Sequence, residues 1–155
     1  MAWGGRKVPP AVIERSTMAG IRQLSAEEFA EFSASDRISI RRYGQLTEDL
    51  ETDVTLAGAT VGLVLNSDSD RVAWTISNSG TANTAALSNL QTVAVTTGIV
   101  IGPGGGAASR NAIEDGSVTG RQVFGVSTSG TTLHIVSTRA YGPVLLLPAG
   151  VLGLS

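Results

Sequence analysis

Few side chains in this sequence combine the residue types and spacing that chemistry requires, and the first to consider is His134. It is the single histidine of the chain, and alternation within 132–136 places it on the face opposite Leu133 and Ile135. A general base needs a partner and a cleft, and the sequence supplies neither. We therefore expect His134 to be a strand residue with a hydrogen-bonded or solvated ring.

Two pairs of acids are close in sequence, Asp68 with Asp70 and Glu114 with Asp115. Paired carboxylates can carry out acid–base work or bind calcium. Both pairs, however, lie among turn-forming residues, and the segment 68–70 lacks the glycine and the closing glutamate of a calcium loop. The chain has no cysteine, which excludes disulfides and thiolate zinc sites. We expect no metal and no cofactor.

The segment 102–107 fits the pattern G-x-G-x-x-A of a dinucleotide-binding loop. That motif needs a helix after it and a ribose-binding acid further along, and neither is present. Pro103 also removes a backbone donor that a phosphate would need. We interpret the segment as a turn between strands. No candidate catalytic residue is left, and we expect the protein not to be an enzyme.

The chain divides into three segments of different charge. Residues 1–24 carry four basic side chains and one acidic, residues 25–53 carry eight acidic and three basic, and residues 54–155 carry only four of each. This break predicts an N-terminal arm over 1–53 and a β-domain over 54–155. The net charge of −2 argues against a general nucleic-acid binder. The longest apolar stretch, broken by Pro148 and Gly150, is too short to cross a membrane.

The first part of the arm is expected to be extended. Pro9 and Pro10 disfavour a helix, and the scattered apolar residues of 1–24 cannot offset their ordering entropy unless they lie on something else. A short helix is predicted at about 25–34, because Ser25 and Glu28 fit a capping box. Alternation over 37–41 then predicts a short strand.

From Val54 onward the pattern is β. A turn at 128–130 predicts a hairpin, and Trp74 is expected in the core. Strands are predicted at 59–65, 71–78, 84–88, 92–95, 98–101, 121–127, 131–137 and 144–147, and 107–113 stays open. Short strands with such turns indicate a mainly β chain, with an antiparallel β-sandwich or small barrel.

The segment from about 61 to 147 resembles a small β-domain that recurs in virion proteins of tailed bacteriophages. The residues that carry the resemblance are a strand, 71–78, that ends in Asn78-Ser79-Gly80, and the later segment 97–105, with its Gly-Ile and Pro-Gly-Gly. Segments similar to 118–126 and 133–136 follow. The resemblance implies a structural role on a virus particle. The long arm is not part of the pattern.

The structural role that the resemblance implies is capsid decoration (cement), a head fibre, or a tail or baseplate accessory. Of these we favour a capsid decoration protein that binds the major capsid protein at the capsid surface. The β-domain is expected to associate with itself, with a trimer favoured, because its Ser/Thr/Ala-rich surface carries little charge. The arm would lie across neighbouring capsid subunits. The candidate partner-binding residues are Trp3, Arg6, Lys7, Val8, Val12, Ile13, Arg15 and Arg22. Two alternatives stay open: a neck, tail or baseplate accessory that binds a portal or tail protein, and a carbohydrate- or receptor-binding module.

Overall fold

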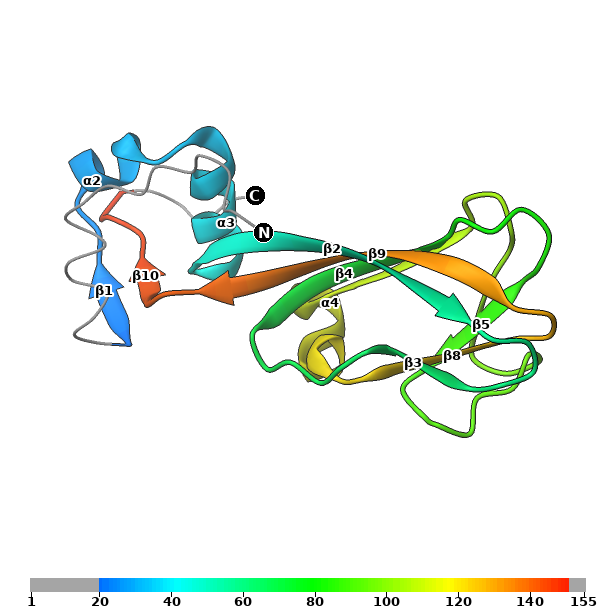
Figure 1. Ribbon diagram of the computed structural model, residues 1–155. Coiled ribbons are helices and arrows are strands. Elements are labelled where there is room, and N and C mark those ends of the chain that lie inside the picture. The colour runs from blue at the N-terminus through cyan, green and yellow to red at the C-terminus, as the bar shows by residue number, and fades with distance from the viewer. Residues whose placement is uncertain (1–19, 151–155) are drawn as a thin grey trace. The chain divides into compact units, whose positions relative to one another are not determined.

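The computed structural model describes residues 20–150 and is mainly β (Figure 1). The chain divides into two compact units. One contains residues 48–139, and the other contains, of the described residues, 20–47 together with 140–150. The larger unit is an antiparallel β-sandwich, which confirms the predicted fold class.

Two four-stranded sheets form the sandwich (Figure 1). Sheet I has the order β2-β9-β4-β7, and sheet II has the order β3-β8-β5-β6. The strands of sheet I are β2 (Leu46–Leu56, of which the part from Glu48 lies in this unit), β4 (Arg71–Asn78), β7 (Ala107–Asn111) and β9 (Thr131–Tyr141). Those of sheet II are β3 (Gly62–Leu65), β5 (Ala85–Ser88), β6 (Ile99–Ile101) and β8 (Val123–Ser127). The short helix α4 (Ala112–Asp115) and the 3-10 turn η1 (Gly116–Gly120) join β7 to β8.

The core of the sandwich is the apolar layer between the two sheets. Trp74 and Ile76 of sheet I and Leu87 of sheet II are almost fully buried in it, and so are Leu133 and Ile135 of β9. Alternate residues of β4 and β9 supply these side chains, as the period of two requires. The prediction that Trp74 lies in the core is confirmed.

Asn78 joins several segments at one end of the sandwich. Its side-chain amide donates to the carbonyls of Asn83 (2.7 Å) and Ile101 (3.3 Å), and its side-chain oxygen accepts from Thr131 Oγ1 (2.7 Å). Its backbone N–H donates to the carbonyl of Gly106, and the N–H of Gly105 donates to the carbonyl of Asn78. The two segments that carry the phage resemblance, 71–80 and 97–105, are therefore bonded to each other at Asn78.

The segment 102–106 is a turn from β6 to β7, as predicted. Gly104 and Gly105 have φ angles of 72° and 103°, which favour glycine. A strand follows the turn instead of the helix that a dinucleotide-binding loop requires. The glycines of this segment serve the turn.

Two predictions for the sandwich, one of a hairpin and one of a strand, were wrong. The turn 128–130 does not make a hairpin, because β8 pairs with β3 and β5 while β9 pairs with β2 and β4 in the other sheet. The same turn residues suit a hairpin and a corner between sheets, and the sequence does not separate the two. The segment 92–95 is a turn, not a strand; its Val93 is buried because it packs on the outside of sheet II.

The smaller unit has its own apolar core. Strand β1 (Ile21–Gln23) pairs in parallel with β10 (Val144–Leu146). Helix α2 (Ala26–Glu31) begins at the predicted capping box, with Ser25 Oγ accepting from the N–H of Glu28 and the Glu28 carboxylate accepting from the N–H of Ser25. The core side chains are Leu24, Phe29, Phe32, Ile40, Leu46 and Leu145.

The predicted strand at 37–41 was wrong, since these residues lie in helix α3 (Ala34–Tyr43). Ser33 caps the start of α3 by accepting from the N–H of Asp36, and Gly44 ends the helix with a φ angle of 68°. The buried residues Phe32, Asp36 and Ile40 are four apart, so the helical period and the two caps override the local alternation.

The boundary observed near residue 47 differs from the predicted division into 1–53 and 54–155. Residues 20–47 fold together with the C-terminal strand β10 because Leu24 and Leu145 share one core. The part of the predicted arm that lies in 1–19 is outside the described residues. No helix within 20–150 is long and apolar enough to cross a membrane.

Candidate assembly surfaces

The outer face of sheet II is apolar. Strand register places Val100, Ala86 and Val126 side by side, and Leu63 beside Phe124. These residues lie on the face opposite the core, because their neighbours along each strand, such as Leu87 and Val123, belong to the core. Outward residues of a sandwich are ordinarily polar, so this face needs an explanation.

The chain itself covers part of this face. Val93, in the loop between β5 and β6, packs with Ala86, Phe124 and Val126. Four large apolar side chains of the face and its loop stay exposed: Leu90 at 67%, Val100 at 55%, Leu63 at 45% and Val95 at 42%. Neighbouring exposed apolar side chains mark interaction surfaces more often than isolated ones do.

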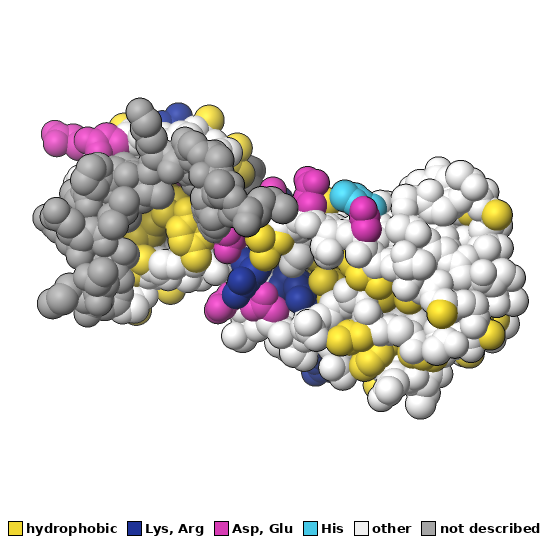
Figure 2. Space-filling model, viewed as in Figure 1, with side chains coloured by type: hydrophobic (Ala, Val, Ile, Leu, Met, Phe, Trp, Pro, Cys, Tyr) yellow, Lys and Arg dark blue, Asp and Glu magenta, His cyan; other side chains and the backbone are white. Residues whose placement is uncertain are grey.

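Sheet II also carries no charge. No Asp, Glu, Lys, Arg or His stands between Arg71 and Arg110, and the segments 54–67 and 122–133 are uncharged as well. On the face drawn in Figure 2, the part of the sandwich at the right is white and yellow, and the charged side chains gather away from it. We call the outer face of sheet II, with Leu63, Leu90, Val95 and Val100, the uncharged face.

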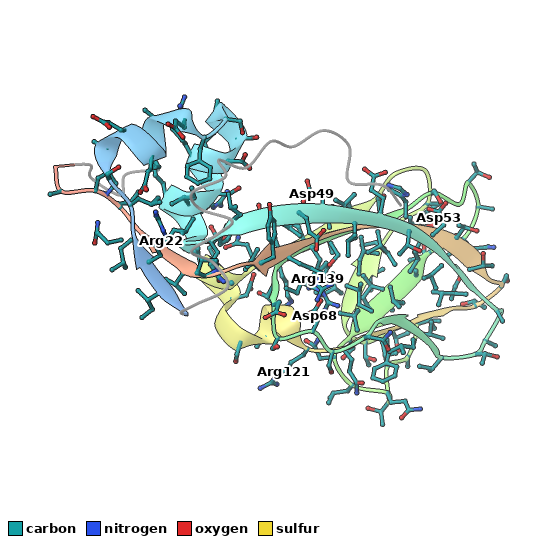
Figure 3. The ribbon with its side chains drawn as sticks, turned by 60° about the vertical axis from the view of Figure 1, so that its left-hand side comes forward. Arg22, Asp49, Asp53, Asp68, Arg121 and Arg139 are labelled. Carbon is teal, nitrogen blue, oxygen red and sulfur yellow. The ribbon has the colours of Figure 1, made fainter. Side chains whose placement is uncertain are left out.

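The outer face of sheet I is polar by contrast. Side chains of β2 and β9 meet across it in pairs: Thr138 Oγ1 donates to Asp49 at 2.6 Å, and His134 Nδ1 lies 2.8 Å from Asp53 Oδ1. The expectation that His134 is a strand residue with a hydrogen-bonded ring is confirmed. Figure 3 shows Asp49 and Asp53 along β2.

Strand β2 is an edge of sheet I, since β9 is its one neighbour in the sheet order. Its residues Glu48, Asp49, Glu51 and Asp53 lie within six consecutive positions. We call these four residues the acidic edge. Edge strands often carry charged side chains that oppose pairing with other chains.

Most of the remaining charge of the sandwich is gathered around Arg71 and Arg139. Buried Arg71 donates to Ser137 Oγ (3.1 Å) and to the carbonyls of Arg121 (3.2 Å) and Asn66 (2.6 Å). Arg139 pairs with Asp68 at 2.8 Å (Figure 3). Burial lowers the pKa of Arg71, and Asp68 partly opposes this shift. These bonds join β4 and β9 to the loops that contain Asn66 and Arg121. The role of the cluster is therefore structural.

The acids considered for chemistry are used within the chain. Asp68 Oδ1 accepts from the N–H of Asp70, Arg110 pairs with Asp115 at 3.1 Å, and Glu114 accepts from the Asn111 amide at 2.9 Å. Among residues 20–150, no group of three or more His, Cys, Asp or Glu side chains could hold a metal ion.

The predicted partner-binding residues fall into two sets. Arg22 lies in β1, where it is buried and makes two bonds to the Glu28 carboxylate, at 2.6 and 3.0 Å (Figure 3 labels Arg22). The bond to Glu28 raises the pKa of Arg22. Arg22 therefore differs from the expectation that it pairs with a partner. The others, Trp3, Arg6, Lys7, Val8, Val12, Ile13 and Arg15, lie outside the described residues.

Sequence reasoning expected a charge-poor surface on the β-domain but located neither of the two surfaces. The sequence does indicate the uncharged face, because no charged residue stands from 72 to 109. Strand register was needed to show which side chains lie on that face. The acids of β2 were counted in the N-terminal arm, and only the sheet order shows that they line an edge of the sandwich.

Comparisons with known proteins add little. No family model matches the chain, and no curated protein matches it. A solved structure of Bacillus endospore appendages, described as a novel family of disulfide-linked pili, contains a similar chain. The likeness covers 61% of this chain and 87% of that chain, at 13% identity and a TM-score of 0.38. A likeness at this level carries no argument about function.

Proposed function

We propose that the protein is a non-enzymatic structural component of a phage virion, a capsid decoration protein that binds the major capsid protein at the capsid surface. The observation that carries this proposal is the uncharged face, an apolar surface on the outside of sheet II. The resemblance of 61–147 to virion β-domains supplies the phage context.

The uncharged face is the proposed site at which copies associate. Copies that pack through this face meet no like-charge repulsion on it, because sheet II has no charged side chain. A charged partner would gain no ion pair on it. The favoured assembly is a homotrimer, as inferred from the charge-poor surface. Burial of Leu63, Leu90, Val95 and Val100 in the assembly would supply the driving force.

The N-terminal segment supplies the proposed contact with the capsid. Its candidate residues are Trp3, Arg6, Lys7, Val8, Val12, Ile13 and Arg15. Trp3 is the anchor, because aromatic side chains dominate interface energetics. Arg22 is no longer among these residues, since it pairs with Glu28 within the chain.

Deletion of residues 1–19 tests the capsid contact. This deletion keeps β1 and its pairing with β10, so the truncated chain retains every described element. Co-sedimentation with capsids that lack the protein measures binding. We expect binding to be lost, and a truncated chain that binds as well as the full chain would remove the segment from the proposal.

Copy number per particle separates the capsid from the tail. Quantitative mass spectrometry of purified virions is expected to find the protein in numbers comparable to those of the major capsid protein. A few copies per particle would favour the neck, tail or baseplate alternative. For the carbohydrate-binding alternative, the sandwich aromatics Trp74 and Phe124 are both buried on strands, so a glycan site would have to use other side chains.

A further inference from the structure

Only two of the four carboxylates of the acidic edge have a bonding partner among residues 20–150. Asp49 and Asp53 accept bonds from Thr138 and His134 of β9. Glu48 and Glu51 have no hydrogen-bond or ion-pair partner among residues 20–150. Asp49, Glu51 and Asp53 stand at alternate positions and therefore on one face of β2, where their like charges repel one another. A cationic ligand along this strand would stabilise them.

The same strand has unused backbone groups. At the edge of a sheet, every second residue points its N–H and C=O groups away from the neighbouring strand. Strand β2 pairs with β9 on one side and with no described strand on the other. An extended peptide can add to such an edge as a further strand. The acidic edge thus suits an extended, cationic segment.

The chain contains such a segment. Residues 1–19 carry Arg6, Lys7 and Arg15 against the single acid Glu14. Fully extended, they reach at most about 68 Å, and the eleven-residue strand β2 spans roughly 36 Å. Charge and length therefore both match the acidic edge.

We propose that the N-terminal segment of one copy docks along the acidic edge of a second copy. Arg6, Lys7 and Arg15 pair with the acidic edge, and the backbone on either side of Pro9 and Pro10, which cannot donate to a ladder, adds to the free side of β2. The choice of a second copy over the same chain rests on the proposed function, which requires copies to associate. A contact between two different surfaces can close into a ring, and a ring of three fits the favoured trimer.

The N-terminal segment would then make two separate contacts. The basic residues join copies to one another, and the capsid contact rests on Trp3, Val8, Val12 and Ile13. The two proposals then fail separately. Loss of capsid co-sedimentation with intact copy-to-copy association leaves the inference standing, and the reverse result leaves the capsid contact standing.

Zero-length cross-linking gives a direct test, because Lys7 is the single lysine of the chain. A carbodiimide activates a carboxylate, and the Lys7 amine displaces the activated group to form an amide. A mixture of normal and heavy-isotope full-length chains is cross-linked and digested. We expect links from Lys7 to the acidic edge in mixed-isotope pairs. Links within one chain, links to other carboxylates, or no links would each overturn the proposal.

Charge reversal gives a second test with a matched control. Glu51→Lys changes the acidic edge, and Glu31→Lys makes the same change on α2; both side chains are exposed and lack a partner in the described chain. Sedimentation of the full chain at low salt should show association about tenfold weaker for E51K. E31K should stay within about twofold of the unchanged protein.

A rescue completes this test. Lys7→Glu in the E51K background should restore part of the association, because the two charges are exchanged. High salt should weaken the association of the unchanged protein. If the acids serve only to block edge pairing, Glu51→Gln would strengthen association instead of weakening it. That result, or an E51K variant that associates like the unchanged protein, would refute the docking.

Discussion

The two outer faces of the sandwich differ although both sheets enclose the same core. On sheet I, most outward residues are polar, and several are hydrogen-bonded in pairs, such as Asp49 with Thr138. On sheet II, outward residues are apolar, and Ala86 and Val126 are as buried as the core. The alternation expected of a sandwich therefore holds on one sheet only.

A strand that carries apolar residues on both faces requires a covering layer on each face. The residues of β8 are buried throughout, whereas those of β9 from Thr131 to Ser137 alternate between buried and half-buried. A strand buried on both faces needs a further layer. The loop with Val93 supplies part of that layer, and the proposed second copy would supply the rest.

The largest effect is expected where both sheets depend on one side chain, Asn78. Asn78→Ala leaves the hydroxyl of Thr131 and the carbonyls of Asn83 and Ile101 without these bonds. Each buried polar group without a partner costs about 1–3 kcal/mol, so we expect roughly 3 kcal/mol of lost stability in urea unfolding. Asn66→Ala is the control: its side chain is exposed and its carbonyl still accepts from Arg71. Equal effects of the two variants would contradict the role of Asn78.

A matched pair of valines compares the faces directly. Val126→Ala removes two methyl groups from the buried outer face of sheet II, and Val136→Ala does so on the half-buried outer face of sheet I. We expect a loss of about 2 kcal/mol for Val126 and less than about 1 kcal/mol for Val136. Chemical unfolding measures both. A larger loss at Val136 would mean that the loop does not act as a layer.

Local patterns predicted several of the sandwich strands, but not β2, whose residues to Asp53 were assigned to the N-terminal arm. The strand from Arg71 to Asn78 was predicted with its observed bounds, and the capping box at Ser25 marked the start of α2. These features depend on neighbours in sequence, such as the alternation around Trp74 and the spacing from Ser25 to Glu28. Nothing distant is needed to recognise them.

The errors came from contacts between distant segments. Alternation over 37–41 suggested a strand, but Ile40 packs against Leu145, and the caps at Ser33 and Gly44 make the segment a helix. The turn 128–130 was recognised, but which sheet accepts β9 is decided by its pairing with β4. The uncharged face depends on register between four strands, which composition alone does not give.

A charge placed on the uncharged face should weaken the association of copies. Val100→Asp places a charge among exposed apolar side chains, and Thr75→Asp places one on the exposed outer face of sheet I. We expect self-association to weaken about tenfold, or about 1.4 kcal/mol, for Val100→Asp and to stay within about twofold for Thr75→Asp. Sedimentation at high salt is the measurement, because salt suppresses the charged contact of the N-terminal segment and leaves the apolar contact. Equal effects would show that the faces do not differ in function.

The smallest effect is expected for the pair His134 and Asp53 on the polar face. Both side chains are well exposed, at 40% and 67%, and exposed pairs contribute about 0.2–1 kcal/mol. A double-mutant cycle with His134→Ala and Asp53→Ala should give a coupling energy of at most about 1 kcal/mol in urea unfolding. The Thr138 and Asp49 pair, changed to alanine in the same way, is the control on the same strands. A coupling well above 1 kcal/mol for the histidine pair alone would mean that His134 does more than satisfy its ring, and would reopen the case for chemistry on this face.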